Sequence, residues 1–161
     1  MEYLDLYDKN KNKIGKKILR GSKIPENTYI MLSLIFIENK NGEYLFQMTS
    51  KEKGSIWATT GGHVKSGDNS FVTIKKELKE ELGLTLNPRK IKHIYTIVKN
   101  NRILEIYYLK EDIDISKLVY QKEEVEYAIW ISKKELKKFI DEDRVRKSNV
   151  NIMKKIEFIK G

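Results

Sequence analysis

The sequence predicts an α+β fold, most simply a mixed β-sheet with helices on its faces. β-Branched and aromatic runs recur between turn signals, and amphipathic segments with helix caps are interspersed among them. The chain has 161 residues, of which 40 % are apolar, so it can bury one sizeable core. Because we find no internal repeat and no low-complexity linker, we expect a single domain over residues 1–161, in which residues 1–25 form an N-terminal strand or hairpin extension.

The N-terminal quarter supplies the first strands. Residues 3–7 and 14–18 predict two short strands around a loop whose asparagines suit a turn. Residues 29–37 are nearly continuous in their apolarity, which is typical of a central strand covered on both faces. Residues 43–48 are expected to return as its hairpin partner after a turn at residues 39–42.

A stretch rich in Gly, Thr and Ser, residues 57–68, predicts a tight loop before the first helix. Its glycines allow backbone conformations that a side chain forbids and let the main chain approach a ligand closely. Asp68 or Ser70 can cap the helix that follows, and Gly83 is placed to end it in a left-handed conformation.

A second hairpin is expected after this helix. Residues 91–98 and 103–109 flank Asn100 and Asn101, a pair that tolerates positive φ in a two-residue turn. An irregular, charged loop over residues 111–122 follows it.

One more strand and two helices complete the expected fold. The strand covers residues 123–131, and Ser132 with Glu135 predicts a capping box for a helix that runs through Ile140. A closing helix is indicated by five spaced apolar residues: Val150, Ile152, Met153, Ile156 and Ile159.

Three glutamates on the first helix form the strongest functional signal. Glu77, Glu80 and Glu81 lie at positions i, i+3 and i+4, so their side chains fall within an arc of roughly 100°. An adjoining apolar stripe would fix the helix to the core and leave the acidic face at its edge: Phe71, Ile74, Leu78 and Leu82. A hard divalent cation would convert the mutual repulsion into binding, which suggests a magnesium-type site. The alternative is an ordinary solvated acidic face, balanced by the lysines beside it.

Composition excludes several classes of chemistry and suggests an anionic partner. The chain has no cysteine, so a disulfide framework, a thiolate zinc site and a cysteine nucleophile are excluded. We find no apolar run long enough to span a membrane and no secretory signal at the N-terminus, so we expect a cytoplasmic protein. The net charge of +9 favours a nucleotide, a polyphosphate or RNA, and residues 9–23 carry seven basic side chains and no acidic one. Compositional drift toward lysine is the alternative explanation.

The stretch from Gly62 to Leu84 resembles the Nudix box. That pattern is Gly, five residues, Glu, seven residues, then Arg-Glu-apolar-any-Glu-Glu-any-Gly-apolar, and every spacing fits here. Two identities depart, because Asp68 stands where Glu is usual and Lys76 where Arg is usual. Trp57 and Trp130 also match where such families place tryptophan.

The resemblance implies an αβα sandwich whose loop-helix-loop holds a divalent metal, Mg²⁺ or in its place Mn²⁺, against a substrate diphosphate. It implies that Glu77, Glu80 and Glu81 are the metal-binding carboxylates, with Glu81 and Glu77 the direct ligands and the Gly62 carbonyl an additional one. It further implies that the general base is a glutamate of the box, Glu80 or Glu81, or Glu124 ahead of the last strand. A solvated start of that strand is the alternative for Glu124.

Three further positions are assigned to substrate contact or loop support. His63 could touch a phosphate or the metal shell, although a structural histidine is the alternative. Lys76 offers a point charge where arginine would offer a bidentate fork, so its positioning should be looser. Asp68 either braces the loop or reaches the metal through water.

The N-terminal segment and the sequence GGHVKSGD are similar to Nudix proteins akin to isopentenyl diphosphate isomerases. Such isomerases place a catalytic cysteine where this chain has Gly61, and without any cysteine that mechanism is not expected. We therefore predict Mg²⁺-dependent hydrolysis of a pyrophosphate bond in a nucleoside diphosphate linked to another group, or in a related diphosphate. A non-hydrolytic nucleotide- or RNA-binding module is the alternative. The hairpin and an exposed sheet edge could support a homodimer.

Overall fold

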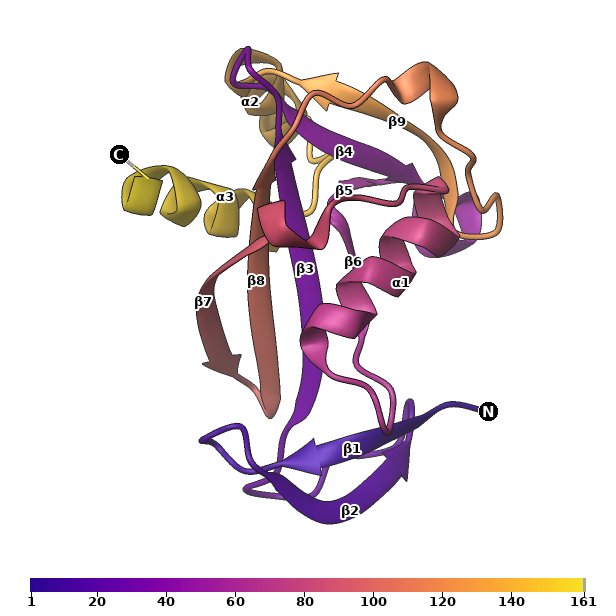
Figure 1. Ribbon diagram of the computed structural model, residues 1–161, viewed down its shortest axis with the longest axis vertical. Coiled ribbons are helices and arrows are strands. Elements are labelled where there is room, and N and C mark those ends of the chain that lie inside the picture. Colours follow the sequence, from indigo (N-terminus) through magenta and orange to yellow (C-terminus); the bar gives the residue numbers. More distant parts are fainter. Residues whose placement is uncertain (161) are drawn as a thin grey trace.

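Two sheets make up the β-structure of the computed structural model, which describes residues 1–160 (Figure 1). The first is an antiparallel N-terminal hairpin of β1 (Tyr3–Tyr7) and β2 (Lys13–Leu19). The second is a seven-stranded mixed sheet, ordered β5-β4-β3-β8-β7, in which β6 also pairs with β3 and β9 also pairs with β4. Its strands are β3 (Ile30–Glu38), β4 (Tyr44–Thr49), β5 (Trp57–Ala58), β6 (Thr60–His63), β7 (Lys92–Lys99), β8 (Arg102–Lys110) and β9 (Val125–Ile131).

β3 lies at the centre of the large sheet, as its apolar sequence predicts. It runs parallel to β8 over its whole length, from Ile30 opposite Arg102 to Glu38 opposite Lys110. On its other edge it pairs antiparallel with β6. A strand with neighbours on both edges and helices over both faces has little exposed backbone, so an apolar run suits it.

The predicted hairpin of β3 and β4 exists only at its turn. Glu38 opposite Tyr44 is the one residue pair in register between them. β6 occupies the edge of β3 from Leu32 to Ile35, so β4 diverges and pairs with β9 and β5 instead. The expected loop over residues 57–68 accordingly contains two short strands, β5 and β6.

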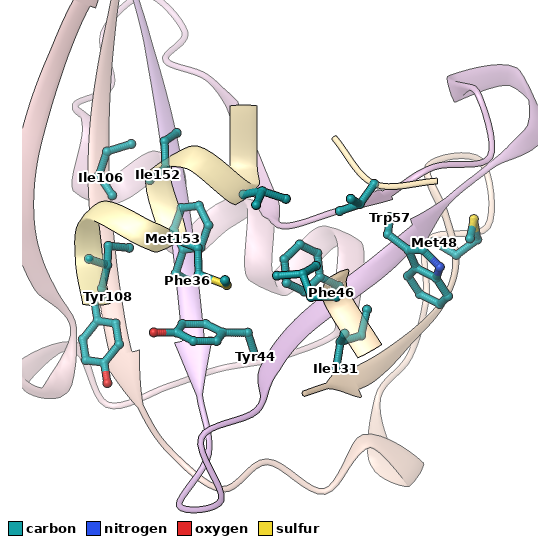
Figure 2. Packing of buried hydrophobic residues seen from close by; sticks show 14 residues of the cluster. Phe36, Tyr44, Phe46, Met48, Trp57, Ile106, Tyr108, Ile131, Ile152 and Met153 are labelled. Carbon is teal, nitrogen blue, oxygen red and sulfur yellow. The ribbon is translucent and has the colours of Figure 1, made fainter. Parts of the chain in front are cut away.

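Three α-helices cover the two faces of the large sheet, so the expected α+β architecture is confirmed (Figure 1). α1 (Ser70–Leu82) packs on one face, where Ile74, Leu78 and Leu82 join a buried cluster with β3, β8 and β9. α2 (Lys133–Asp141) and α3 (Lys147–Lys160) pack on the other face. Figure 2 shows Ile152 and Met153 of α3 beside Phe36 of β3.

The helix caps agree with the sequence except at the start of α1. The N-cap is Asn69, whose side chain accepts a hydrogen bond from the Val72 amide at 2.8 Å, so the prediction of Asp68 or Ser70 was wrong. Gly83 ends α1 with φ at 64°, and the capping box of Ser132 and Glu135 is present.

Turns and short 3₁₀ helices form several of the connections between these strands and helices. Asn100 and Asn101 turn the β7–β8 hairpin with φ of 52° and 61°, as predicted. Single 3₁₀ turns lie at Lys51–Lys53, at Pro88–Lys90 and, within the predicted irregular loop, at Ile115–Lys117. Among residues 1–160 we find no helix long and apolar enough to cross a membrane.

The N-terminal hairpin lies against the end of the large sheet and the loop before α1 (Figure 1). Leu4 and Leu6 of β1 pack with Ile30 of β3 in a small buried cluster. The Tyr3 carbonyl accepts a hydrogen bond from the Ser66 amide at 2.8 Å. The hairpin therefore reaches the glycine-rich loop that the sequence marks as functional.

Candidate active site

α1 turns two of its three glutamates toward β6 and β4. Glu81 is buried, with 7 % of its surface exposed, and its Oε2 accepts a hydrogen bond from the Gln47 Nε2 at 2.9 Å. Gln47 in turn accepts a hydrogen bond from the Thr60 hydroxyl at 2.8 Å. The carboxylate is thus held by an amide that β4 supplies and β6 orients.

Glu77 lies directly against the backbone of β6. A Cβ atom added at Gly62 would stand 2.5 Å from the Glu77 Oε1, closer than real contacts allow. The neighbouring Gly61 is packed tightly for another reason, since a Cβ there would stand 2.3 Å from the Leu34 Cδ2 and 2.5 Å from the Ser33 carbonyl oxygen. Gly62 therefore leaves room for the carboxylate, and Gly61 leaves room for β3.

Burial of this pair makes its negative charge costly. Burial raises the pKa of Glu77 to about 7, and the charge of Glu80 adds to that effect. Burial likewise raises the pKa of Glu81 to about 8; the Gln47 hydrogen bond opposes this rise, and the charges of Glu77 and Glu124 add to it. A bound cation would offset these unfavourable interactions.

The residues present fit a hard divalent cation. Most of the side chains that could ligate a metal around the pair are carboxylates, whose oxygen atoms Mg²⁺ prefers, and His63 is the one nitrogen ligand among them. Within residues 1–160 no three His, Asp or Glu side chains are already grouped so that they could hold a metal ion. Mg²⁺ commonly keeps several water and phosphate ligands, so it needs only one or two carboxylates of this site.

A cavity of about 380 Å³ opens over the pair. It brings together six of the residues that the sequence singled out: Gly62, His63, Glu77, Glu80, Glu81 and Glu124. Asp68 and Lys76 lie outside it and form an ion pair of 2.9 Å, lining a smaller adjoining recess with His63, Glu77 and Glu80. The two departures from the box pattern therefore contact each other.

His63 and Glu124 lie in the cavity wall. The His63 ring contributes to several adjoining cavities, and burial lowers its pKa to about 4, with help from the charges of Arg20 and Arg102. Its ring is therefore neutral at pH 7. Glu124 lies just before β9, and Lys53 is 3.6 Å from its carboxylate.

Five residues of the site were not predicted from the sequence: Glu2, Arg20, Gln47, Lys65 and Gln121. Glu2 binds both Arg20, at 3.0 Å, and Lys65, at 3.2 Å. Gln47 carried one signal, because it is the single amide in the otherwise apolar run YLFQM. Arg20 carried a weaker one, as the only arginine in the basic segment.

The basic segment over residues 9–23 is largely occupied by contacts within the molecule. Lys11 pairs with Glu105 at 3.2 Å, Lys13 with Asp5 at 3.1 Å and Arg20 with Glu2 at 3.0 Å. The Lys17 ammonium lies over the Tyr3 ring. Much of the positive charge that suggested RNA is therefore used inside the fold.

A family model described as the NUDIX domain matches residues 32–154. The chain belongs to the Nudix family. Gly62 to Leu84 is accordingly its Nudix box, and the residues of β1 and β2 precede the matched region. The kinship with isomerase-like Nudix proteins stays a prediction.

Two curated Nudix relatives match part of the chain. A protein of Listeria innocua named Uncharacterized Nudix hydrolase lin0387 is 30 % identical over 91 residues, 54 % of each chain. Nudix hydrolase 3 of Arabidopsis thaliana is 29 % identical over 105 residues, which cover 61 % of this chain and 13 % of that protein. The matched part thus spans about half of the Listeria relative and far less of the plant one.

Solved structures share the Nudix fold at low sequence identity. The protein DR0079 from Deinococcus radiodurans superposes with a TM-score of 0.71 at 19 % identity, over 89 % of this chain and 91 % of that one. An Ap4A hydrolase of C. elegans gives a TM-score of 0.57 at 18 % identity, over 81 % and 98 % of the two chains. These similarities confirm the fold class that the sequence predicts.

Proposed function

We propose that this Nudix domain hydrolyses a pyrophosphate bond in a nucleoside diphosphate linked to another group, or in a related diphosphate. The reaction depends on Mg²⁺, which Mn²⁺ can replace. The observation that carries the proposal is a pair of carboxylates that line a cavity: Glu81 is buried, and the half-buried Glu77 lies against the Gly62 backbone.

Glu81 and Glu77 would bind the cation directly, with Glu80 as the neighbouring carboxylate and the Gly62 carbonyl as an additional ligand. When bound, the cation neutralises phosphate oxygens and lowers the pKa of bound water. The buried amide of Gln47 keeps Glu81 in place for this role. Asp68 and Lys76 support the loop through their ion pair and do not enter the cavity.

The remaining residues of the cavity act on the substrate and on the attacking water. Arg20 and Lys65 supply positive charge toward the diphosphate, and the neutral His63 ring can donate a hydrogen bond to a phosphate oxygen. A water molecule attacks one phosphorus, and the bond from that phosphorus to the bridging oxygen breaks. Glu124 lies in the cavity wall, where it can accept the proton of that water, with Glu80 or Glu81 as the alternative base.

A substrate panel tests this function. Nucleotides, dinucleoside polyphosphates, nucleotide sugars and prenyl diphosphates are assayed with Mg²⁺, with Mn²⁺ and with EDTA. We expect metal-dependent turnover of at least one class and a loss of more than about 100-fold in kcat/KM on Glu81→Gln. Full activity of that variant would contradict the proposal, as would the absence of turnover from the whole panel.

Paired variants separate the candidate bases. Glu124→Gln removes a carboxylate of the cavity, whereas Glu123→Gln removes its exposed neighbour, which does not line the cavity. We expect the first to lower kcat and the second to leave it unchanged. If both variants keep the wild-type rate, the base belongs to the box.

The non-hydrolytic nucleotide- or RNA-binding module is the second candidate, but the observed contacts favour the hydrolase. Asp68 and Lys76 compensate each other, and the carboxylate pair is intact. RNA binding that weakens steeply between 50 and 200 mM salt, without turnover, would favour the module instead.

A further inference from the structure

A second cavity, of about 560 Å³, lies between the N-terminal hairpin and the β7–β8 turn. We call it the hairpin cavity. Four aliphatic side chains line it: Leu4, Ile18, Ile24 and Ile30. It shares Arg20 and His63 with the cavity over the carboxylate pair, so the two adjoin.

The two cavities differ in charge. Five glutamates line the carboxylate cavity: Glu2, Glu77, Glu80, Glu81 and Glu124. Three cations line the hairpin cavity, Arg20, Lys23 and Arg102, and none of its lining residues is acidic. The cavity over the carboxylate pair is thus acidic, and the hairpin cavity is basic.

Two of these three cations are not neutralised by a carboxylate. Arg20 binds Glu2 at 3.0 Å, but Arg102 donates only to the Asn100 carbonyl, at 3.2 Å, within its own turn. Lys23 makes no ion pair with the residues that the structure describes. Lys23 and Arg102 are exposed at the cavity mouth, so their charges are available to an anion that enters it.

We propose that the hairpin cavity binds the part of the substrate beyond the diphosphate, and that this part carries a further anionic group, a phosphate or a carboxylate. This inference rests on the proposed function, which places the diphosphate at the carboxylate pair. The volume lies within the roughly 300–1,000 Å³ of small-molecule sites. No Phe, Tyr or Trp lines the cavity, and its one aromatic ring is the His63 imidazole, so it suits an aliphatic or sugar group better than a stacked base.

Matched ligand pairs that differ by one anionic group test the inference. UDP-glucuronate and UDP-glucose differ by a carboxylate, whereas NADPH and NADH, or coenzyme A and dephospho-coenzyme A, differ by a phosphate. Calorimetry gives the dissociation constant of each ligand, measured on Glu81→Gln with Mg²⁺ and on the wild-type protein with Ca²⁺. Turnover of each ligand by the wild-type protein with Mg²⁺ is followed in parallel. We expect the more anionic member of at least one pair to bind about 10-fold tighter.

Variants of the hairpin cavity assign that preference. Lys23→Gln and Arg102→Gln should each lower it at least threefold, while circular dichroism confirms that the variants are folded. Lys16→Gln is the matched control, because Lys16 lies on the same hairpin, is exposed and does not line the cavity. It should leave the preference unchanged.

The outcomes separate this inference from the proposed function. Three outcomes would overturn the hairpin cavity as an anion site. The first is a preference for the more anionic ligand of less than about 10-fold in every pair, and the second is no binding of any ligand. The third is a preference that survives both Lys23→Gln and Arg102→Gln. Turnover with no such preference would overturn the inference alone. A preference that these variants lower, without turnover of any ligand, would overturn the hydrolase and leave the site.

Discussion

Gly61 and Gly62 are adjacent, yet each leaves room for a different neighbour. The Gly61 position faces β3, where the nearest atoms include a backbone carbonyl that cannot move freely. The Gly62 position faces the end of a flexible side chain, the Glu77 carboxylate. One residue therefore governs packing and the next governs the geometry of the candidate metal site.

Alanine substitutions should separate these two roles. Gly61→Ala places a methyl group against Leu34 and Ser33, so we expect about 1–3 kcal/mol of lost stability in urea denaturation. Gly62→Ala should cost less stability, because Glu77 can rotate away, but should weaken Mg²⁺ binding in calorimetry. If Gly62→Ala binds Mg²⁺ like the wild type, Glu77 does not need its present position.

The buried glutamates should make the metal-free protein less stable as the pH rises. The raised pKa values of Glu77 and Glu81 mean that the folded state holds protons that the unfolded state has released. This stabilisation is complete below about pH 4.5 and is lost as the pH rises through about 7 to 8. His63 acts in the opposite sense, but only below about pH 6.5, because its pKa is lowered.

The test is urea denaturation in EDTA between pH 6.5 and 8.5. The unfolding free energy should fall on the order of 1–2 kcal/mol over this range, and Mg²⁺ should restore it. Glu81→Gln should flatten the profile. A profile in which stability rises with pH, or one that Glu81→Gln leaves unchanged, would contradict the assignment of buried, proton-holding carboxylates.

At the scale of elements, the N-terminus of α1 shows a feature that the local sequence does not determine, namely which residue caps the helix. Asp68, Asn69 and Ser70 are all good capping residues, and only the backbone conformation decides among them. Asn69 is the residue in extended conformation whose side chain reaches the Val72 amide. The helix, its glycine stop and its acidic face needed only short-range patterns and were predictable.

The cap can be verified by mutation. Asn69→Ala should lower stability by about 1 kcal/mol, because the Val72 amide loses its partner. Asp68→Ala should cost less than that, since it removes a partly exposed ion pair with Lys76. Equal losses in urea denaturation would mean that both residues cap the helix.

Long-range pairing explains what the sequence did not show. β4 separates from β3 because β6 occupies the edge of β3 that β4 would otherwise pair with. Nothing in the sequence of residues 43–48 predicts that β6 takes this edge. The contribution of Arg20 to the active site depends on where the whole hairpin packs. The carboxylate set was predictable because one helix carries it, whereas its supports come from strands distant in sequence.

At the scale of the whole molecule, Asp5 connects the hairpin to the Nudix box. Its two carboxylate oxygens accept hydrogen bonds from the Ser66 hydroxyl, at 2.7 Å, and the Gly67 amide, at 3.0 Å. These bonds, with the Lys13 ion pair, keep the pKa of Asp5 below its usual value despite burial. The loop before α1 is thus held from outside the matched family region.

Asp5→Ala should therefore loosen this loop and affect the active site at a distance. We expect faster amide hydrogen exchange at residues 64–68 and a reduced kcat/KM, with rescue of both by Asp5→Glu if the longer side chain still reaches the loop. Asp8→Ala is the control, because Asp8 bonds only within its own turn. Unchanged exchange in Asp5→Ala would contradict a positioning role.

The homodimer expected from the sequence stays a prediction, which light scattering can test.

The division of the cleft between two chain segments has an evolutionary consequence. Glu77, Glu80 and Glu81 lie within the matched Nudix region, whereas Arg20, Lys23 and all four aliphatic residues of the hairpin cavity precede it. Under the proposed function, substitutions in the hairpin would change which substrates are accepted without altering the carboxylates proposed to hold the metal. On these two proposals, substrate selectivity and catalysis would evolve in different chain segments, and exchanging hairpins between related chains would change substrate preference.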